Sequence, residues 1–454
     1  MPSRTPVVSI VMATFNFERF IARAIESALA QDYPEEALDI VVIDDGSTDS
    51  TPQVVLPYLD RVRYIRKPNG GLLTTVNRGL AEARGEFISL LSGDDEFLPG
   101  KTRAQVDFML EHPEVGLVYA DLEVVDDDGR QIHASLWEAG KLKQVRGRAF
   151  GPLLTKNVVS GGAMMFRSSL KPVFHPIPDT AAWEDWYIAL KIASVAEIDY
   201  IPQAVYRYRF HGDNMNLGAK GDKFAALLRI ELRFRRSLLA ELEPGLVTVA
   251  ELTSGCAAFN NTANTLSQMT GEPIESLIEV TDDDRRQSRE LVETRAGVFA
   301  LVNALALDPW NAQAQNLLTT ALNPPALDGV RSFATLAYAA ELVAAPEMLA
   351  AYASVFSAPD DATLVVYGDA DEIGALADVL EDRGLADADG PDILAVTQGT
   401  PYALAGSVRA VYSRRPQDDV LAGCPRVDDS RAAILRELAR DAAPATAPEP
   451  QPRQ

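Results

Sequence analysis

The sequence has little cysteine and no long apolar run. Its 454 residues include two cysteines, Cys256 and Cys424, which excludes a disulfide framework and a cysteine-rich zinc site. No apolar run approaches the ~20 residues that a membrane-spanning helix needs. The N-terminus lacks the basic start and the small-residue cleavage site of a signal peptide. We therefore expect a cytoplasmic protein without a transmembrane segment.

The sequence is also short of basic residues. It contains 42 Lys and Arg against 65 Asp and Glu, which gives a formal net charge of −23. This charge argues against a nucleic-acid partner, because non-specific binding needs cations that displace phosphate counterions. It argues equally against attachment to anionic lipid by charge alone. The apolar fraction of 47% is typical of a globular protein and excludes wholesale disorder.

Strand and helix signals alternate in the N-terminal half. Short apolar runs indicate strands at 7–12, 39–43, 62–65 and 87–91. Apolar residues at helical spacing lie between them, at 20–30, 51–58 and 73–83. Strands that are apolar throughout and separated by helices predict a mainly parallel sheet covered on both faces. We therefore assign residues 1–218 to an α/β domain.

The rest of the chain is predicted to form three parts. Residues 219–358 are rich in Ala, Leu, Glu and Arg with few strand signals, so we expect them to be helical. Residues 359–440 return to alternating strands and helices, which predicts a small acidic α/β domain. Gly368, between a strand and a helix, leaves a nucleotide pocket as an alternative to a packing or association module. The tail at 441–454, rich in Ala, Pro and Gln, is predicted to be disordered.

Two acidic pairs directly follow predicted strands. Asp44 and Asp45 end the second strand, and Asp94 and Asp95 come after the fourth. Ligands of such sheets bind at the carboxyl ends of the strands, so we expect both pairs to meet at one rim. An Asp there can accept a hydrogen bond from a base imide or a ribose hydroxyl. The alternative for residues 44–49 is a helix N-cap.

The second acidic pair indicates a divalent cation. Carboxylates are suitable ligands for Mg²⁺ or Mn²⁺, which take oxygen ligands and bridge substrate phosphates. Two bare carboxylates would repel a nucleotide diphosphate, so the pair makes physical sense mainly with a metal between protein and ligand. A solvated acidic turn is the alternative interpretation of Asp94 and Asp95.

A third acidic pair, Glu184 and Asp185, lies between two tryptophans at the start of a predicted helix. Acids in a first helical turn are favoured by the helix dipole, whatever their function. The functional interpretation is a general base. The indoles of Trp183 and Trp186 would then desolvate the carboxylate, raise its pKa and offer apolar faces on which a sugar stacks.

Taken together in their order and spacing, these motifs resemble the family 2 glycosyltransferases, inverting enzymes with the GT-A fold. The resemblance runs from residue 6 to about residue 216 and is carried by VSIVMATFN at 8–16, VIDDGSTD at 42–49, NGG at 69–71, NRGLA at 77–81, GEFI at 85–88, SGDD at 92–95 and EDW at 184–186. It covers a little under half of the chain and says nothing about residues 221–454.

The resemblance implies a metal-dependent transfer of a sugar from a nucleotide-diphosphate sugar to a hydroxyl. UDP or TDP donors are expected more than GDP donors. The acceptor would be a glycan, a lipid-linked molecule or a protein, in the synthesis of a cell-surface polysaccharide or glycoconjugate. The nucleotide-binding residues that the family pattern implies are Thr14, Phe15, Asp45 and Asp94.

The same resemblance implies the metal ligands and the base. Asp95 would ligate Mn²⁺ or Mg²⁺, and His211 stands where some relatives have a metal- or phosphate-contacting histidine. Asp185 would take the proton from the acceptor hydroxyl, and Glu184 is the second candidate for this role. The metal would offset charge on the departing diphosphate in place of a general acid.

Two other functions stay open at this point. A nucleotidyltransferase would also use an α/β sheet with acidic metal ligands. It predicts a Gly-rich, basic loop after the first strand, whereas residues 13–18 contain no glycine. A scaffold that binds a sugar nucleotide without catalysis is the other possibility, although it has no need of a positioned base.

Overall fold

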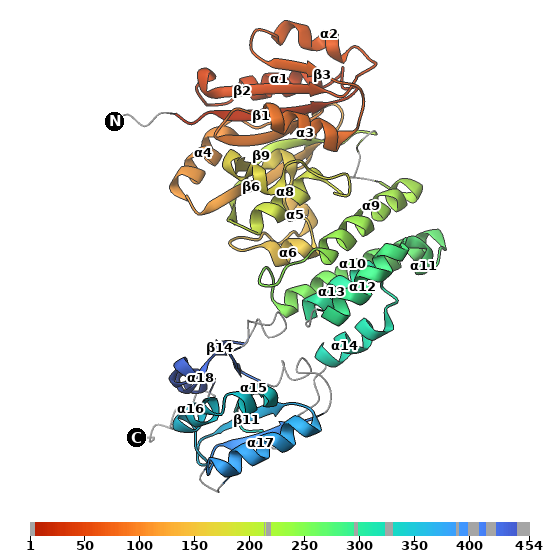
Figure 1. Ribbon diagram of the computed structural model, residues 1–454. Helices are drawn as coiled ribbons and strands as arrows, with labels where there is room; N and C mark the ends of the chain where they lie inside the picture. The colour runs from red at the N-terminus through yellow and green to blue at the C-terminus, as the bar shows by residue number, and fades with distance from the viewer. Residues whose placement is uncertain are drawn as a thin grey trace, which may run out of the picture. The chain divides into compact units, whose positions relative to one another are not determined.

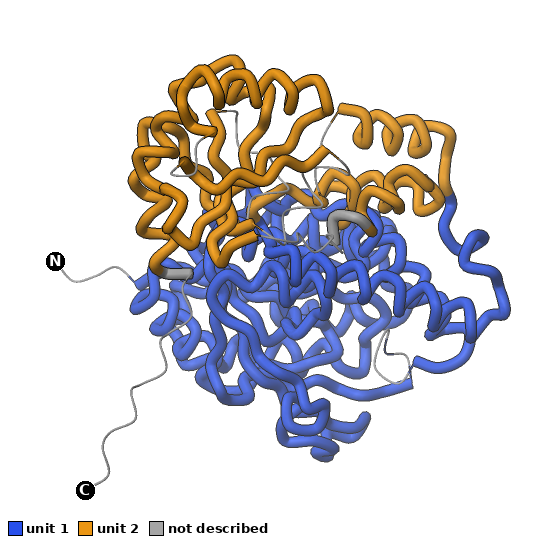
Figure 2. Tube along the Cα trace, turned by 90° about the horizontal axis from the view of Figure 1, so that it is seen from below, with its two compact units in different colours: residues 1–238, 246–279 blue, residues 239–245, 280–454 orange. Residues whose placement is uncertain are grey.

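The computed structural model describes residues 5–212, 214, 219–294, 298–322, 330–386, 390–397, 408–414 and 424–442. The chain divides into two compact units (Figure 2). The first contains residues 1–238 and 246–279, and the second contains residues 239–245 and 280–454. This division into two units does not test the domain boundaries predicted from the sequence, which remain a prediction. Apart from its first two residues, the predicted disordered tail lies outside the described residues.

The first unit is built on a nine-stranded sheet (Figure 1). Its main path runs β3-β2-β1-β4-β8-β6-β9-β5, and β7 pairs with β6 at its side. The first four strands on this path pair in parallel, and β8 runs antiparallel to both of its neighbours. The strands are β1 (Val8–Thr14), β2 (Leu38–Asp44), β3 (Arg63–Arg66), β4 (Phe87–Ser92), β5 (Glu96–Phe97), β6 (Val115–Val125), β7 (Gln131–His133), β8 (Met165–Arg167) and β9 (Glu197–Arg209).

Helices and short turns join these strands. The α-helices of the first unit are α1 (Ile21–Leu29), α2 (Thr51–Val55), α3 (Leu72–Glu82), α4 (Lys101–Glu111), α5 (Leu136–Gly140), α6 (Phe150–Thr155), α7 (Lys171–Phe174), α8 (Glu184–Ala193), α9 (Gly221–Ala240), α10 (Val249–Thr270) and α11 (Ile274–Leu277). The fold class predicted from the alternation of strands and helices is confirmed. Within the described residues, no helix has the length and apolar character that a membrane span requires.

The two faces of β1 show why this sequence forms a covered sheet. Alternate residues of a strand point to opposite faces. Ile10 and Met12 pack in one core with Ile21 and Ile25 of α1, while Val11 lies against α3 on the other face. Because β2 and β4 both pair in parallel with β1, the carboxyl ends of these three strands share one edge of the sheet. The loops that follow them gather at this edge.

The second unit contains a helical group and a smaller parallel sheet. The helices α12 (Asp282–Thr294), α13 (Val298–Leu307) and α14 (Ala312–Leu322) come first. The sheet has the order β12-β11-β10-β13-β14. The strands of this sheet, with the helices that connect and follow them, are β10 (Phe333–Tyr338), α15 (Ala339–Ala344), α16 (Glu347–Val355), β11 (Ala362–Tyr367), α17 (Ala370–Asp382), β12 (Asp392–Val396), β13 (Ala410–Tyr412), β14 (Arg426–Val427) and α18 (Ala433–Ala442).

The expectation that residues 219–358 are helical is wrong at 333–338, which form the central strand β10. Alanine at 334 and 337 gives this segment a helix-like composition. Tertiary pairing nevertheless makes the segment a strand, because β11 and β13 flank it on both sides and every residue up to Ala337 is buried. The sheet of the second unit therefore begins earlier in the chain than its composition indicates.

Gly368 follows β11 and serves packing in this sheet. A Cβ atom there would lie 2.6 Å from the Cβ atom of Ala339, so the absence of a side chain lets α15 approach. The Glu341 side chain in α15 accepts hydrogen bonds from Ser413 Oγ, at 2.6 Å, and from Arg414 N after β13. These contacts support the packing interpretation of Gly368 over a nucleotide pocket.

We expect Gly79→Ala to destabilise the first unit by about 1–3 kcal/mol, which is the usual cost of overpacking. The added Cβ atom would lie 2.2 Å from Val11 Cγ1, and a valine in a strand has little rotamer freedom to move away. Chemical denaturation of the full chain measures the change. Gly374→Ala, in α17 with no atom within 4 Å of its added Cβ, is the matched control and should be neutral or slightly stabilising.

Candidate functional site

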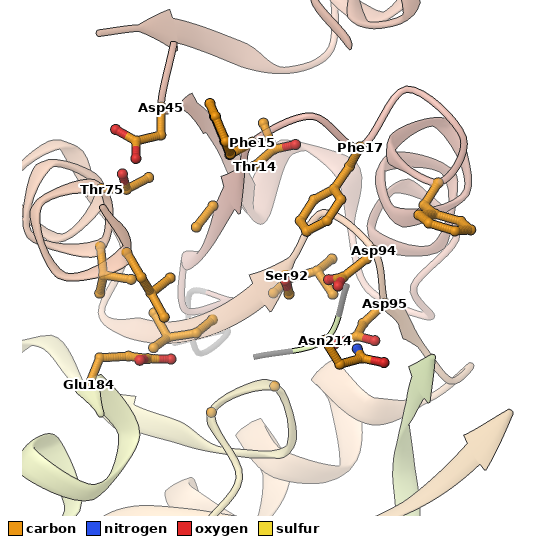
Figure 3. Close-up of a pocket in the computed structure, with 18 of the residues that line it drawn as sticks. Thr14, Phe15, Phe17, Asp45, Thr75, Ser92, Asp94, Asp95, Glu184 and Asn214 are labelled. Carbon is orange, nitrogen blue, oxygen red and sulfur yellow. The ribbon is translucent and has the colours of Figure 1, made fainter. Parts of the chain in front are cut away.

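A cavity of about 860 Å³ opens at the carboxyl edge of the large sheet. It is bounded by the loops after β1, β2, β4 and β9, by residues 160–162 and by the start of α8. Figure 3 shows Asp94, Asp95 and Asn214 grouped on one side, with Glu184 on the opposite side. All eight residues singled out from the sequence line this cavity: Thr14, Phe15, Asp45, Asp94, Asp95, Glu184, Asp185 and His211.

The first acidic pair divides into a structural and a cavity-facing residue. Asp44 is fully buried, and its carboxylate accepts hydrogen bonds from Ser47 N, at 2.7 Å, and from the hydroxyl of Tyr64. It is absent from the cavity wall, whereas Asp45 is part of it. The expected meeting of both acidic pairs at one rim therefore holds for Asp45, Asp94 and Asp95. It fails for Asp44, which ends β2 with its side chain turned into the protein.

Three donors fix the carboxylate of Asp45. Gly70 N donates to Oδ1 at 2.9 Å and Gly71 N donates to Oδ2 at 2.8 Å, while the Lys67 ammonium pairs with Oδ1. Burial would raise the pKa of Asp45, but the hydrogen bonds from Lys67, Gly70 and Gly71 outweigh it and lower the pKa. Asp45 is thus held as a carboxylate, which only accepts hydrogen bonds.

The loops after β1 and β2 are bound to each other beside Asp45. Asn16 N donates to Ser47 Oγ at 3.0 Å, and Thr48 N donates to Asn16 Oδ1 at 2.7 Å. Asp49 accepts from Glu18 N at 3.0 Å and from Thr51 N at 2.9 Å. The N-cap residue of α2 is Ser50, and its side chain makes no capping hydrogen bond, so the N-cap interpretation fails. Most of these contacts instead cross-link the two loops. Thr14 and Phe15 owe their position to this pairing.

Asp94 presents an acceptor atom without a partner. Its Oδ2 lies 3.0 Å from His211 Nε2, and its Oδ1 is buried with no hydrogen-bond partner among the described residues. The His211 ring is itself buried and stacks on Phe20 at a centroid distance of 5.2 Å. A buried acceptor left open in this way is costly unless a ligand supplies the missing donor or cation.

Asp95 is satisfied by the protein on both oxygens. Arg209 N donates to Oδ1 at 2.7 Å and the Tyr206 hydroxyl donates to Oδ2. Burial and the adjacent charge of Asp94 raise the pKa of Asp95. Each oxygen that accepts one hydrogen bond still has a second lone pair. Asp95 therefore keeps some capacity for a cation, although less than Asp94.

The donor set fits a divalent cation that also binds substrate. Within the described ranges, no three His, Cys, Asp or Glu side chains form a ready-made metal site. The open oxygen of Asp94, with Asp95 next to it, matches instead the pattern of Mg²⁺ sites. There one or two carboxylates hold the ion and substrate phosphates complete its shell. His211 Nε2 is engaged with Asp94, so direct ligation by this atom requires breaking that contact.

The third acidic pair begins α8. Asp185 Oδ1 accepts from Asn157 Nδ2 at 3.0 Å and from Trp186 N at 2.6 Å, and its Oδ2 accepts from Gly161 N at 3.1 Å. Burial raises the pKa of Asp185 despite these donors, and burial together with the charge of Asp185 raises the pKa of Glu184. Glu184 Oε2 is buried with no partner in the described structure.

The two tryptophans beside this pair differ in function. Trp183 lines the cavity, and its Nε1 is buried without a described partner. Trp186 is only 2% exposed, and its Nε1 donates to Leu153 O at 2.7 Å. The expectation that both indoles offer stacking faces to a sugar is therefore wrong for Trp186, which points into the core because α9 covers it.

Asn77 connects the two ends of the cavity. Its Nδ2 donates to Ile177 O and its Oδ1 accepts from Ile177 N, both at 2.8 Å. Asn77 belongs to α3, whose preceding residues Gly70 and Gly71 bind Asp45, while Ile177 lies in the segment that leads to Trp183 and α8. One side chain thus joins the helix next to Asp45 to the segment before Asp185.

Three residues that hold the carboxylates of the site were not predicted from the sequence. Lys67 follows β3 at the same rim as Asp45, so a cation after a parallel strand was a usable signal. Tyr206 lies in β9, where the alternation of Tyr206 and Tyr208 indicates one polar face turned to the cavity. No local signal marks Asn157, because its partner Asp185 is 28 residues away.

Residues 9–174 match the family model described as "Glycosyl transferase family 2". Over these residues the chain is therefore similar to family 2 of the glycosyltransferases, the class of enzyme and the fold that its motifs predict. An "uncharacterized glycosyltransferase" of Rickettsia felis is 32% identical over 223 residues, which are 46% of this chain and 35% of that protein. An "uncharacterized protein" of Mycobacterium tuberculosis is 30% identical over 213 residues, 45% of this chain and 60% of that protein. The chain thus spans about a third of the first relative and three fifths of the second.

Two solved structures illustrate the structural comparison. S. aureus TarS 1–349 in complex with UDP-GlcNAc aligns with a TM-score of 0.44 and 19% identity, over 70% of this chain and 85% of that one. The mannosyltransferase PcManGT from Pyrobaculum calidifontis, in complex with GDP-Man and Mn²⁺, aligns with a TM-score of 0.43 and 16% identity, over 68% and 89%.

We expect Lys67→Met to lower the free energy of unfolding by about 2 kcal/mol at pH 7, the typical worth of a hydrogen bond to a charged group. The pKa of Asp45 is lowered in the folded state. The stabilisation is therefore complete above the unfolded pKa of about 4 and disappears as the pH falls through the folded pKa. Urea denaturation at several pH values measures it. The difference from wild type should shrink below about pH 4, and Lys67→Arg, which keeps the cation, should show a smaller loss at pH 7. A loss that does not change with pH would contradict this account.

Proposed function

We propose that the first unit transfers a sugar from a nucleotide-diphosphate sugar to an acceptor hydroxyl with inversion at the anomeric carbon. The observation that carries this proposal is the carboxylate of Asp185, which three N–H donors hold in the wall of the cavity that also contains Asp45 and Asp94. A base and an acidic, cation-attracting group facing one cavity are what transfer between a hydroxyl and a diphosphate leaving group requires. The match of residues 9–174 to the family 2 model supports the same reaction class.

The nucleotide is proposed to bind between the loops after β1 and β2. Asp45, held ionised by Lys67, accepts a hydrogen bond from a base N–H, such as the N3–H of uracil or thymine. Thr14 contributes a buried hydroxyl without a described partner, and Phe15, 39% exposed, offers an apolar face. Donors of the UDP or TDP type are proposed ahead of GDP donors because they are more frequent in the family that the motifs resemble.

The diphosphate and its cation are proposed to lie at Asp94 and Asp95. Asp94 Oδ1 is the acceptor left open by the protein, and His211 orients the other oxygen of the same carboxylate. A bound Mn²⁺ or Mg²⁺ supplies charge neutralisation to the departing diphosphate. His211 is proposed to act chiefly through Asp94, since its Nε2 already contacts that residue.

Asp185 is the proposed general base. Its raised pKa matches it better to a hydroxyl proton than an ordinary aspartate would be, and it remains ionised once the pH exceeds that raised value. It removes the proton of the acceptor hydroxyl, whose oxygen forms the new bond to the anomeric carbon as the bond to the diphosphate breaks on the opposite face. Glu184, with its open Oε2, is proposed to hold a sugar hydroxyl beside the base. The acceptor is proposed to be a glycan or a glycoconjugate precursor of the cell surface.

Nucleotide binding should depend on the base and on the metal. A ligand that binds only the folded state raises its stability by mass action. We therefore expect UDP or TDP with Mn²⁺ to raise the melting temperature of the full chain more than GDP, ADP or any nucleotide with chelator. Differential scanning fluorimetry with this panel is the measurement. If no nucleoside diphosphate shifts the melting temperature with metal present, the donor site does not exist as proposed.

Asp185→Asn should leave the nucleotide-induced shift intact and reduce transfer by about 10²–10⁴-fold, the usual contribution of a general base. Glu184→Gln is the matched comparison, since it neutralises the neighbouring carboxyl and leaves Asp185 in place. It keeps a side chain that can bind a hydroxyl and should reduce transfer less than Asp185→Asn. The wild-type rate should decline as the pH falls through the raised pKa of Asp185. A product assay with radiolabelled donor sugar measures all three. Transfer that survives Asp185→Asn but not Glu184→Gln would exchange the two roles, and sugar-nucleotide binding without any product would favour a scaffold.

A further inference from the structure

The short helix α6 ends next to the proposed base, and side chains from outside bind its last carbonyl oxygens. The final carbonyls of any helix lack partners within the helix. Leu153 O accepts from Trp186 Nε1 at 2.7 Å, while Leu154 O and Thr155 O accept from the Arg235 guanidinium at 2.9 and 3.0 Å. A cation at this end of a helix also matches the direction of its dipole.

Arg235 is held rigidly in this position. It belongs to α9, and only 7% of it is exposed. Its Nε donates to Glu231 Oε1 at 2.8 Å, and its guanidinium carbon lies 4.8 Å from the ring centroid of Trp186. The neighbouring Phe234 contacts the same indole edge-to-face, at a centroid distance of 5.1 Å. The guanidinium therefore binds two elements at once, the end of α6 and the indole at the start of α8.

Both of those elements continue directly into groups that hold Asp185. Two residues after α6, Asn157 donates to Asp185 Oδ1, and further along the same segment Gly161 N donates to Oδ2. From the other side, Trp186 follows Asp185 in the chain and its backbone N–H donates to Oδ1. The contacts form a closed ring from Asp185 through Trp186 and α6 to Asn157 and back to Asp185. Arg235 is not a member of this ring, but it contacts two of its parts, Trp186 and the end of α6.

We propose that Arg235 is a positioning residue for Asp185. Helix α9, which lies beyond the family-matched segment 9–174, is then part of the catalytic machinery and not only an addition to it. Arg235 is absent from the cavity wall, so it acts through Trp186 and α6 and not on the substrate. The proposal rests on the proposed function of Asp185. Helix α10 also packs on α6, where a Cβ atom at Gly255 would lie 2.6 Å from Leu154 Cδ2.

The test uses Arg235→Met in the full chain. Methionine keeps a long apolar side chain against Trp186 but removes the donors to Leu154 O and Thr155 O. We expect kcat for transfer to fall between tenfold and a hundredfold, as small misplacements of a reacting group do. The KM for the donor and the nucleotide-induced thermal shift should stay unchanged, because Asp45 and Asp94 are not touched. Arg233→Met, an exposed arginine on the same helix, is the matched control and should change neither parameter.

Two further variants separate positioning from stability. Arg235→Lys keeps one cation and should retain more kcat than Arg235→Met, and guanidinium ion added at millimolar concentration should restore part of the kcat of Arg235→Ala. A purely structural role would lower the melting temperature of these variants while leaving kcat at low temperature equal to that of the wild type, and this result would overturn the proposal. A rise in donor KM equal to the fall in kcat would overturn it as well.

Hydrogen–deuterium exchange tests the ring of contacts without any activity. In Arg235→Met, amides at 153–161 should exchange at least tenfold faster than in wild type, with the Gly161 amide among them, while amides at 40–49 should not change. Unchanged exchange at 153–161 would overturn the proposal. If exchange rises as expected but wild-type protein transfers no sugar, the proposed function fails while the attachment of α6 by Arg235 stands, so the two failures are distinguishable.

Discussion

Repulsion between carboxylates within one cavity is the constraint on which the first unit depends. Several acids face a space of about 860 Å³, and each charge that leaves water must gain donors or a cation. The fold supplies these donors from separate elements. Asp45 takes them from the start of α3 and from Lys67, Asp95 from β9, and Asp185 from the segment between α6 and β8. The loops are therefore ordered by the acids they surround.

Two carboxylate oxygens in the cavity do not gain a donor in this way. Asp94 Oδ1 and Glu184 Oε2 are buried acceptors that the described residues leave without a donor. They lie on opposite sides of the cavity (Figure 3). A protein that satisfies nearly all its buried polar atoms leaves such gaps where something else binds. We propose that a cation binds at the open oxygen of Asp94 and a hydroxyl at that of Glu184.

Local patterns in the sequence were sufficient to predict the first half of the large sheet and its cavity edge. The strands β1, β2 and β4 are continuous apolar runs, and the acids that follow them must share an edge because parallel strands end on the same side. The same patterns do not decide between Asp44 and Asp45. These neighbours point in different directions, and only the position of Tyr64 on the next strand shows which of them turns inward.

The features that could not be predicted from the sequence depend on contacts between distant segments. Strand β10 has an alanine-rich sequence, and its pairing with β11 and β13 outweighs that composition. Trp186 was expected in the cavity because it flanks Glu184 and Asp185 in the sequence. Helix α9, about 50 residues later, provides the aromatic and cationic partners that hold it in the core. Propensity and spacing describe one segment at a time, whereas these outcomes belong to pairs of segments.

The pairing of Asn77 with Ile177 restricts how the length of α3 can vary. The backbone before α3 binds Asp45 through Gly71, and Asn77 binds the segment leading to Asp185. One inserted residue between those two points would move Asn77 by about 1.5 Å along the helix and turn it by about 100°. Both amide contacts with Ile177 would then be lost. Insertions and deletions are therefore tolerable in the surface loops of this unit but not within residues 72–76, whose number sets the spacing between the two ends of the cavity.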